Sequence, residues 1–159
     1  MKKIEYLLVV LGEECAEAAQ QTSKVIRGGM TQIEPGQTED NWRRLERELA
    51  DIMATAELLE LRIPDQDKEK EIEHPLIVLV EKCAETVQRA SKAIRFGMTE
   101  IEPGQTENNR RRLECKLADI MAMARLRGLR IRDEDKDAKR KKLEKFMEYS
   151  REIGILEKE

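Results

Sequence analysis

The sequence predicts an all-α protein, and three observations support this prediction. Charged residues make up 40% of the chain and hydrophobic residues another 40%, whereas aromatic residues contribute only 3%. That balance suits helices with one apolar stripe and a charged outer face better than a β-sandwich, which needs aromatic and β-branched runs. Apolar residues also recur at helical spacing, and a long segment of the chain occurs twice. We therefore expect two tandem helical hairpins packed as a four-helix bundle, plus a C-terminal helix.

The duplication becomes visible when the sequence is shifted by 68 positions. Residues 13–68 then align without a gap on residues 81–136, and 18 of the 56 aligned positions differ. The loop at 29–39 matches the loop at 97–107 except at Gln32, where the second copy has glutamate. Such a repeat indicates one supersecondary unit that is used twice.

Each unit is expected to be a pair of helices joined by a turn. In the first unit, apolar residues follow the helical period from Leu7 to Ile26, and Gly28-Gly29 is expected to end this helix. Thr38 is a suitable N-cap for a second helix, which should end before Pro64.

Four segments follow from this assignment. The first hairpin is expected at 1–64, a charged linker at 65–75, the second hairpin at 76–132, and a C-terminal helix with a tail at 133–159. Four apolar residues of the last helix are expected to form a seam that closes the bundle: Leu143, Phe146, Met147 and Tyr149.

Charge, hydropathy and cysteine usage exclude several classes of function. The formal net charge is -3 and the pI is near 5.5, so no global basic field is expected to attract nucleic acid. The apolar run Tyr6–Gly12 is far too short to cross a membrane. The three cysteines form no C-x-x-C pair, and reduced thiols in the cytoplasm are the simplest interpretation.

Both helices of the first hairpin carry a pair of acidic residues three positions apart. Glu14 and Glu17 lie in the first helix, and Glu48 and Asp51 in the second. Residues three apart share one helix face. In an antiparallel hairpin, residues at one height have a constant sum of their numbers. This sum is 65 for Glu14 with Asp51 and also for Glu17 with Glu48, so all four carboxylates are expected at one level.

Four carboxylates at one level are expected to bind a divalent cation. Their charges would repel strongly in a partly buried site unless a cation neutralised them. Mg²⁺ prefers oxygen ligands and also accepts phosphate oxygens, so we predict Mg²⁺, with Mn²⁺ as the alternative ion. The competing interpretation is a solvated helix face, which is the usual role of such residues.

Polar side chains extend the same two helix faces beyond the acidic residues. Gln21 and Lys24 continue the first helix, and Asn41 and Arg44 continue the second at matching heights. Arg27 lies close to this stripe. Cationic and amide groups of this kind suit a phosphate and a base or sugar, so these five residues are predicted to bind a nucleotide.

With these acidic pairs on two consecutive helices, the sequence resembles the MazG-like family of all-α nucleoside triphosphate pyrophosphohydrolases. The family motif is E-E-x-x-E followed by E-x-x-D, and this chain has Glu13-Glu14-x-x-Glu17 and Glu48-x-x-Asp51. The resemblance covers residues 6–61 and 76–129 and leaves the C-terminal helix unexplained.

The resemblance implies hydrolysis of a nucleoside triphosphate between its α and β phosphates, giving a monophosphate and pyrophosphate. Glu14, Glu17, Glu48 and Asp51 would hold Mg²⁺. Glu14 or Glu17, with Glu13 as a less favoured candidate, would accept the proton of the attacking water, and the sequence leaves the choice open. Members of the family assemble as dimers or as dimers of dimers, so a homodimer of the tandem chain is a further expectation.

The second repeat departs from the motif at two positions. Lys82 replaces Glu14 and Lys116 replaces Glu48, whereas Glu85 and Asp119 keep the acidic positions. Height matching places Lys82 beside Asp119 and Glu85 beside Lys116, so this cluster neutralises itself without a metal. The second repeat is therefore predicted to be a catalytically dead partner, or else to bind substrate without a metal.

Other polar positions of the first repeat are kept in the second. Lys92, Arg95, Asn109 and Arg112 are candidates for contacts to a nucleotide across the interface. Trp42 has Arg110 as its counterpart and is expected either to pack in the core or to stack on a base.

Two further functions compete with triphosphate hydrolysis. The loss of acidic residues in the second repeat makes a non-catalytic nucleotide-binding or helical interaction module credible. The hydrolysis of phosphoribosyl-ATP, which uses a related helical site, is a more remote alternative.

Overall fold

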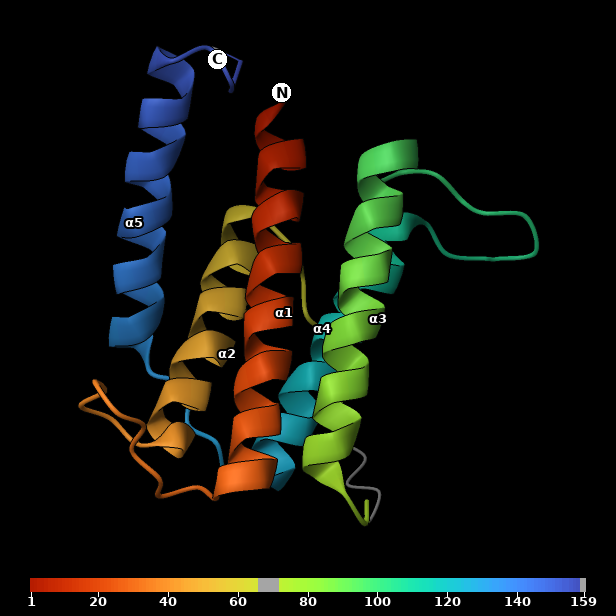
Figure 1. Cartoon of the computed structure of the whole chain (residues 1–159). Helices are drawn as coiled ribbons and strands as arrows, with labels where there is room; N and C mark the ends of the chain where they lie inside the picture. The colour runs from red at the N-terminus through yellow and green to blue at the C-terminus, as the bar shows by residue number, and fades with distance from the viewer. Residues whose placement is uncertain (66–71, 158–159) are drawn as a thin grey trace.

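The computed structural model describes residues 1–65 and 72–157, which form five helices and no strand (Figure 1). The predicted all-α fold is thus confirmed. The helices are α1 (Lys3–Gly28), α2 (Asn41–Leu58), α3 (Pro75–Phe96), α4 (Asn109–Leu126) and α5 (Asp133–Glu152).

The first four helices form two antiparallel hairpins that lie side by side (Figure 1). α1 packs on α2 within the first hairpin, and α3 packs on α4 within the second. The hairpins meet mainly through α1 and α3, and α5 packs against α2 on the far side of the first hairpin. The core is built mainly from leucines, isoleucines and small residues of the four hairpin helices, to which α5 adds Met147, and Leu11, Leu49, Leu79 and Leu117 are fully buried.

Glycine ends the first helix of each hairpin, as predicted. Gly29 and its counterpart Gly97 have φ angles of 90° and 92°, which an L side chain rarely adopts. Asp40 is the N-cap of α2, because its carboxylate accepts a hydrogen bond from the Arg43 amide at 2.8 Å. The expectation that Thr38 would cap α2 was therefore wrong by two residues, since the loop continues to Asp40 before the helix begins.

The buried face of α5 differs from the predicted seam. Leu143 and Met147 are buried as expected, but Phe146 and Tyr149 are 48% and 56% exposed. The buried stripe instead follows spacings of four and three residues: Lys139, Leu143, Met147 and Ser150. A lysine therefore occupies the first buried position of this helix.

The segment that leaves each hairpin is held by the other hairpin. The Arg62 amide, just after α2, donates a hydrogen bond of 2.9 Å to Glu114 Oε1 on α4. The Arg130 amide, just after α4, donates one of 2.8 Å to Glu46 Oε1 on α2. The two glutamates are equivalent positions of the repeat, as are the two arginines, so the hairpins are joined by a reciprocal contact.

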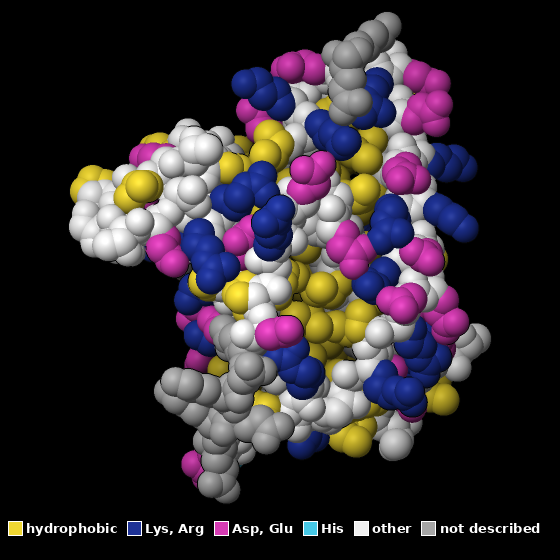
Figure 2. Space-filling model, turned by 180° about the vertical axis from the view of Figure 1, so that it is seen from behind, with side chains coloured by type: hydrophobic (Ala, Val, Ile, Leu, Met, Phe, Trp, Pro, Cys, Tyr) yellow, Lys and Arg dark blue, Asp and Glu magenta, His cyan; other side chains and the backbone are white. Residues whose placement is uncertain are grey.

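The structure describes only part of the predicted linker and tail. Residues 66–71 of the predicted linker and 158–159 of the predicted tail lie outside the described residues. No helix in the described part of the chain has the length and apolar character needed to cross a bilayer. Figure 2 shows that cationic and acidic side chains are interspersed over one face, around a hollow lined by hydrophobic side chains.

Candidate metal centre

Three of the four predicted acidic residues converge between α1 and α2. Glu14, Glu17 and Glu48 each place a carboxylate oxygen within 4.8 Å of the other two. Glu14 is the deepest of them, with only 5% of its surface exposed. The convergence follows from the sequence, because Glu14 and Glu17 are one turn apart on α1 and face Glu48 on α2.

The fourth acidic residue, Asp51, joins the other three through a lysine of α5. Lys139 Nζ lies 2.5 Å from Glu14 Oε1 and 3.1 Å from Asp51 Oδ2. Lys139 is only 8% exposed, so its ammonium group is enclosed between α5 and the first hairpin. We refer to Glu14, Glu17, Glu48 and Asp51 as the acidic cluster.

One ammonium group does not neutralise the acidic cluster. Burial, together with the charges of Glu17, Asp51 and Glu14, raises the pKa of Glu48 to about 7. Burial also raises the pKa of Glu14 and that of Asp51, even though Lys139 opposes the rise at both carboxyl groups. Two ionised carboxylates about 5 Å apart repel by roughly 3 kcal/mol at an effective dielectric constant of about 20. The cluster therefore has an excess of negative charge.

Within the described residues, two buried oxygens of this cluster have no hydrogen-bond partner. They are Glu14 Oε2 and Glu48 Oε2, one from each helix. Buried carboxylate oxygens are normally paired, because their desolvation is costly. Converging carboxylates with unpaired oxygens are the donor set that hard divalent cations such as Mg²⁺ and Mn²⁺ prefer. The residues present therefore fit a metal of this kind.

The equivalent cluster of the second hairpin is paired internally, as the sequence predicts. Lys116 Nζ lies 2.6 Å from Glu85 Oε2, and Lys82 Nζ lies 3.8 Å from Asp119 Oδ2. Lys82 also lies 3.3 Å from Glu85. Hydrogen bonds from Lys116 and Lys82 lower the pKa of Glu85, the reverse of the shift at Glu14, Glu48 and Asp51. The surroundings therefore raise carboxyl pKa values at the site in the first hairpin and lower the pKa of Glu85 at the equivalent site in the second.

Gln21 and Asn41 bind each other instead of facing an open site. Gln21 Nε2 donates to the backbone oxygen of Asn41 at 3.0 Å and to Asn41 Oδ1 at 3.3 Å. Asn41 Nδ2 donates to the Gly29 oxygen at 3.1 Å and so ties the loop to the start of α2. Their exposed fractions are only 3% and 0%, which puts both side chains beyond the reach of a nucleotide in this structure.

The predicted phosphate-binding cations of the first hairpin converge on a glutamate of the loop. Arg44 Nη1 and Lys24 Nζ lie 2.6 Å and 3.1 Å from Glu34 Oε2. Arg44 and then Lys24 lower the pKa of Glu34 through these hydrogen bonds. Arg27 lies in the last turn of α1 and is exposed. Two cations are therefore gathered at one point, as phosphate binding requires, but an internal carboxylate occupies it.

The second hairpin repeats this arrangement around its own loop. Arg112 and Lys92 lie 2.9 Å and 3.0 Å from the carboxylate of Glu102, and their hydrogen bonds lower its pKa to about 2. Asn109 is fully buried and donates to the Gly97 oxygen. Arg95 is exposed and its guanidinium lies 5.3 Å from the centre of the Phe96 ring. The two loops lie at opposite ends of the molecule, so these residues serve their own hairpin (Figure 1).

Sequence reasoning did not identify Lys139 or Glu34 as part of the site. The signal for Lys139 was its spacing, because it precedes Leu143 and Met147 at intervals of four residues on an otherwise apolar stripe. The signal for Glu34 was the near identity of the two loops, in which Glu102 holds the same position.

The remaining candidates belong to the core. Trp42 is half-buried and packs against the hydrophobic core, with the Arg127 guanidinium 5.7 Å from its ring centre, which favours the core-packing alternative. Cys15 and Cys83 are equivalent, fully buried and not disulfide-bonded. Burial raises the pKa of Cys83 to about 12, so its thiol is not a nucleophile near neutral pH.

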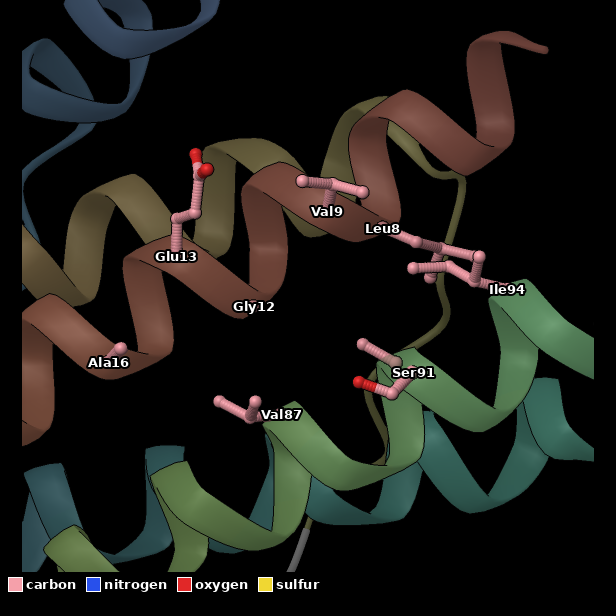
Figure 3. A pocket seen from close by; sticks show the side chains of 9 residues that line it. Leu8, Val9, Gly12, Glu13, Ala16, Val87, Ser91 and Ile94 are labelled. Carbon is pink, nitrogen blue, oxygen red and sulfur yellow. The ribbon is translucent and has the colours of Figure 1, made fainter. Parts of the chain in front are cut away.

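A shallow apolar groove of about 320 Å³ lies between α1 and α3, away from the acidic cluster (Figure 3). The hydrophobic side chains of Leu8, Val9, Val87 and Ile94 are part of its lining. Glu13, the first residue of the E-E-x-x-E motif, borders the groove, but its carboxylate points away from α3. Glu14 and Glu17 of this motif therefore belong to the acidic cluster, whereas Glu13 does not.

Comparisons with models of protein families, with curated proteins and with solved structures found no match for this chain.

Proposed function

We propose that the protein is a metal-dependent pyrophosphohydrolase that cleaves a nucleoside triphosphate, using the acidic cluster of the first hairpin. The observation that supports this proposal is the contrast between the two hairpins. Equivalent positions carry four acids with two unpaired buried oxygens in one hairpin and two ion-paired lysines in the other. The E-E-x-x-E and E-x-x-D resemblance to MazG-like enzymes supplies the class of reaction.

Glu14, Glu17, Glu48 and Asp51 would hold Mg²⁺ or Mn²⁺. A bound ion would screen the charge of the phosphates and acidify a water molecule. Glu17 is the most exposed member of the cluster that lacks a lysine partner, so we assign it the role of accepting the proton of the attacking water. Attack breaks the bond between the α and β phosphates, and pyrophosphate leaves. Lys24 and Arg44 would bind the phosphates after they release Glu34.

The decisive experiment measures pyrophosphate release from a panel of ribo- and deoxyribonucleoside triphosphates and phosphoribosyl-ATP, with Mg²⁺, with Mn²⁺ and with chelator. We expect metal-dependent release from at least one triphosphate, and its loss in Glu48→Lys. That variant copies the residue of the second hairpin, so it should remain folded. Lys116→Gln, at the equivalent position, should retain wild-type turnover. Turnover that survives in Glu48→Lys would exclude the acidic cluster as the active site.

A non-catalytic nucleotide-binding module is the second candidate, and two internal contacts favour it. Lys139 forms ion pairs with part of the acidic cluster, and Glu34 forms ion pairs with the cations that a phosphate would need. This candidate predicts that nucleotides bind, measured by calorimetry, without pyrophosphate release under any metal condition.

A further inference from the structure

Lys139 of α5 lies at the acidic cluster, on the side of the cluster that faces this helix. Lys139 bridges Glu14 Oε1 and Asp51 Oδ2, which come from α1 and α2. Its position on α5 belongs to the buried stripe that continues through Leu143 and Met147. A buried lysine is costly unless acidic partners surround it, so the acidic cluster explains why a charged residue is accepted at this position.

Lys139 uses carboxylate oxygens that the proposed metal would need. A cation held by all four acids would draw on Glu14 and Asp51, the two residues that Lys139 contacts. An ammonium group and a divalent ion on the same carboxylates repel each other, so each weakens the binding of the other. The unpaired oxygens of Glu14 and Glu48 show that the lysine leaves part of the cluster unsatisfied. The lysine is therefore a partial substitute for a divalent ion.

Apart from the buried Leu143 and Met147, the other contacts between α5 and the first hairpin are mainly ion pairs. Glu57 on α2 pairs with Lys136 at 3.0 Å and with Arg140, and Arg43 pairs with Asp135 at 2.7 Å. The pairs of Glu57 involve side chains that are 20–35% exposed, and exposed ion pairs contribute little stability, whereas the bidentate Arg43–Asp135 pair is less exposed and holds α5 more firmly. Four of the seven large hydrophobic residues from 143 to 156 are about half exposed: Phe146, Tyr149, Ile153 and Ile155. Few apolar contacts are characteristic of elements that open locally.

We propose that Lys139 competes with the divalent cation for the acidic cluster, so that α5 sets the metal affinity of the site. This inference rests on the proposed metal centre and adds its regulation. In the metal-free protein, Lys139 sits between Glu14 and Asp51. When the metal binds, the ammonium group leaves these carboxylates and becomes accessible to solvent. The second hairpin does not need such a device, because Lys82 and Lys116 already pair with its acids.

The test is the affinity of the full chain for Mn²⁺ alone, measured by electron paramagnetic resonance of the free ion. Lys139→Met removes the competing charge and keeps a long apolar side chain. Lys145→Met is the matched control, since Lys145 lies on the same helix and is exposed. We expect Lys139→Met to bind Mn²⁺ at least about tenfold more tightly than wild type, and Lys145→Met to stay within about twofold. Equal affinities in the two variants, or weaker binding by Lys139→Met, would overturn the proposal.

A second measurement uses only the wild-type chain and so does not depend on the folding of a variant. Amine acetylation followed by mass spectrometry should modify Lys139 slowly in chelator and markedly faster with Mn²⁺, whereas Lys145 should react equally in both. Unchanged protection of Lys139 in protein saturated with Mn²⁺ would contradict the competition.

The outcomes separate this inference from the proposed reaction. Tighter binding by Lys139→Met without turnover of any triphosphate would support the competition and exclude the hydrolysis. Turnover combined with equal affinities would do the reverse. If no protein binds Mn²⁺, the metal centre itself is absent and both proposals fail.

Discussion

Glu48 and Lys116 occupy equivalent positions, and each faces a glutamate on the first helix of its own hairpin. Glu48 lies close to Glu17, which contributes to the rise of its pKa to about 7. Lys116 instead holds Glu85 at 2.6 Å. One side-chain exchange thus turns a repulsive contact into an attractive one within the same backbone framework.

Restoring the acidic residues of the second hairpin should create a second metal site. The double variant Lys82→Glu/Lys116→Glu gives that hairpin the same four acids as the first. We expect it to bind twice as many Mn²⁺ ions as wild type, because the added carboxylates have no lysine left to pair with. Calorimetric stoichiometry gives the count. Lys141→Glu/Lys145→Glu, an equal change of charge on the exposed face of α5, should leave the count unaltered.

The metal-free protein should lose stability as the pH rises through the titration of Glu48. The pKa of Glu48 is about 7 in the folded protein and about 4.3 in an unfolded chain, so the folded state holds the proton more tightly. Ionisation of Glu48 therefore destabilises the folded state progressively between these two values. Near pH 8, Glu48→Gln should be more stable than wild type by up to about 3 kcal/mol, and near pH 4 the difference should vanish.

Urea titrations in chelator at both pH values measure this difference directly. Adding Mn²⁺ near pH 8 should stabilise wild type and leave Glu48→Gln almost unaffected, because a ligand stabilises only the state that binds it. Equal stabilities of the two proteins near pH 8 in chelator would show that Glu48 titrates normally.

We expect Asn41 to contribute to the stability of the fold rather than to nucleotide binding. Its buried side chain links Gln21 to the Gly29 oxygen. Asn41→Ala removes the donor to the Gly29 oxygen and one of the two acceptors of Gln21, and we expect a loss of roughly 1–2 kcal/mol in the free energy of unfolding. Asn109→Ala breaks the equivalent bond to Gly97 and should cost a similar amount. A variant with unchanged stability but weaker nucleotide binding would return Asn41 to the substrate site.

The turn after each hairpin offers a paired test of backbone strain. Glu60 has a φ angle of 55°, and the equivalent residue of the second hairpin is Gly128, with a φ angle of 72°. The left-handed conformation costs an L residue roughly 1–2 kcal/mol. Glu60→Gly should therefore stabilise the protein by up to about 1 kcal/mol, and Gly128→Ala should destabilise it by a similar amount. Thermal unfolding of both variants reveals whether the signs are opposite.

The features that the sequence predicted are those fixed by local periodicity and by the repeat. Glu14, Glu17 and Glu48 converge because helical spacing and antiparallel register decide which side chains share one level. The pairing of Lys82 with Asp119 follows from the same register in the second copy.

The features that the sequence did not predict arise from contacts between distant segments. Lys139 meets Glu14 across 125 positions of the chain, and Lys139 lies beyond the end of the repeat, so no internal comparison could place it. The seam of α5 was mispredicted for a related reason. Aromatic residues were expected inside, but the buried stripe runs through Lys139, Leu143, Met147 and Ser150, and Phe146 and Tyr149 lie outside it.

The exchange of exit segments has the geometry of a symmetric homodimer, because Glu46 receives Arg130 just as Glu114 receives Arg62. A single ancestral hairpin with one such glutamate and one such segment would carry both halves of an isologous contact and could pair with its own copy. In that dimer every substitution alters both sites at once. Covalent fusion removes this constraint, so one half can trade its metal ligands for lysines while the other half keeps its chemistry.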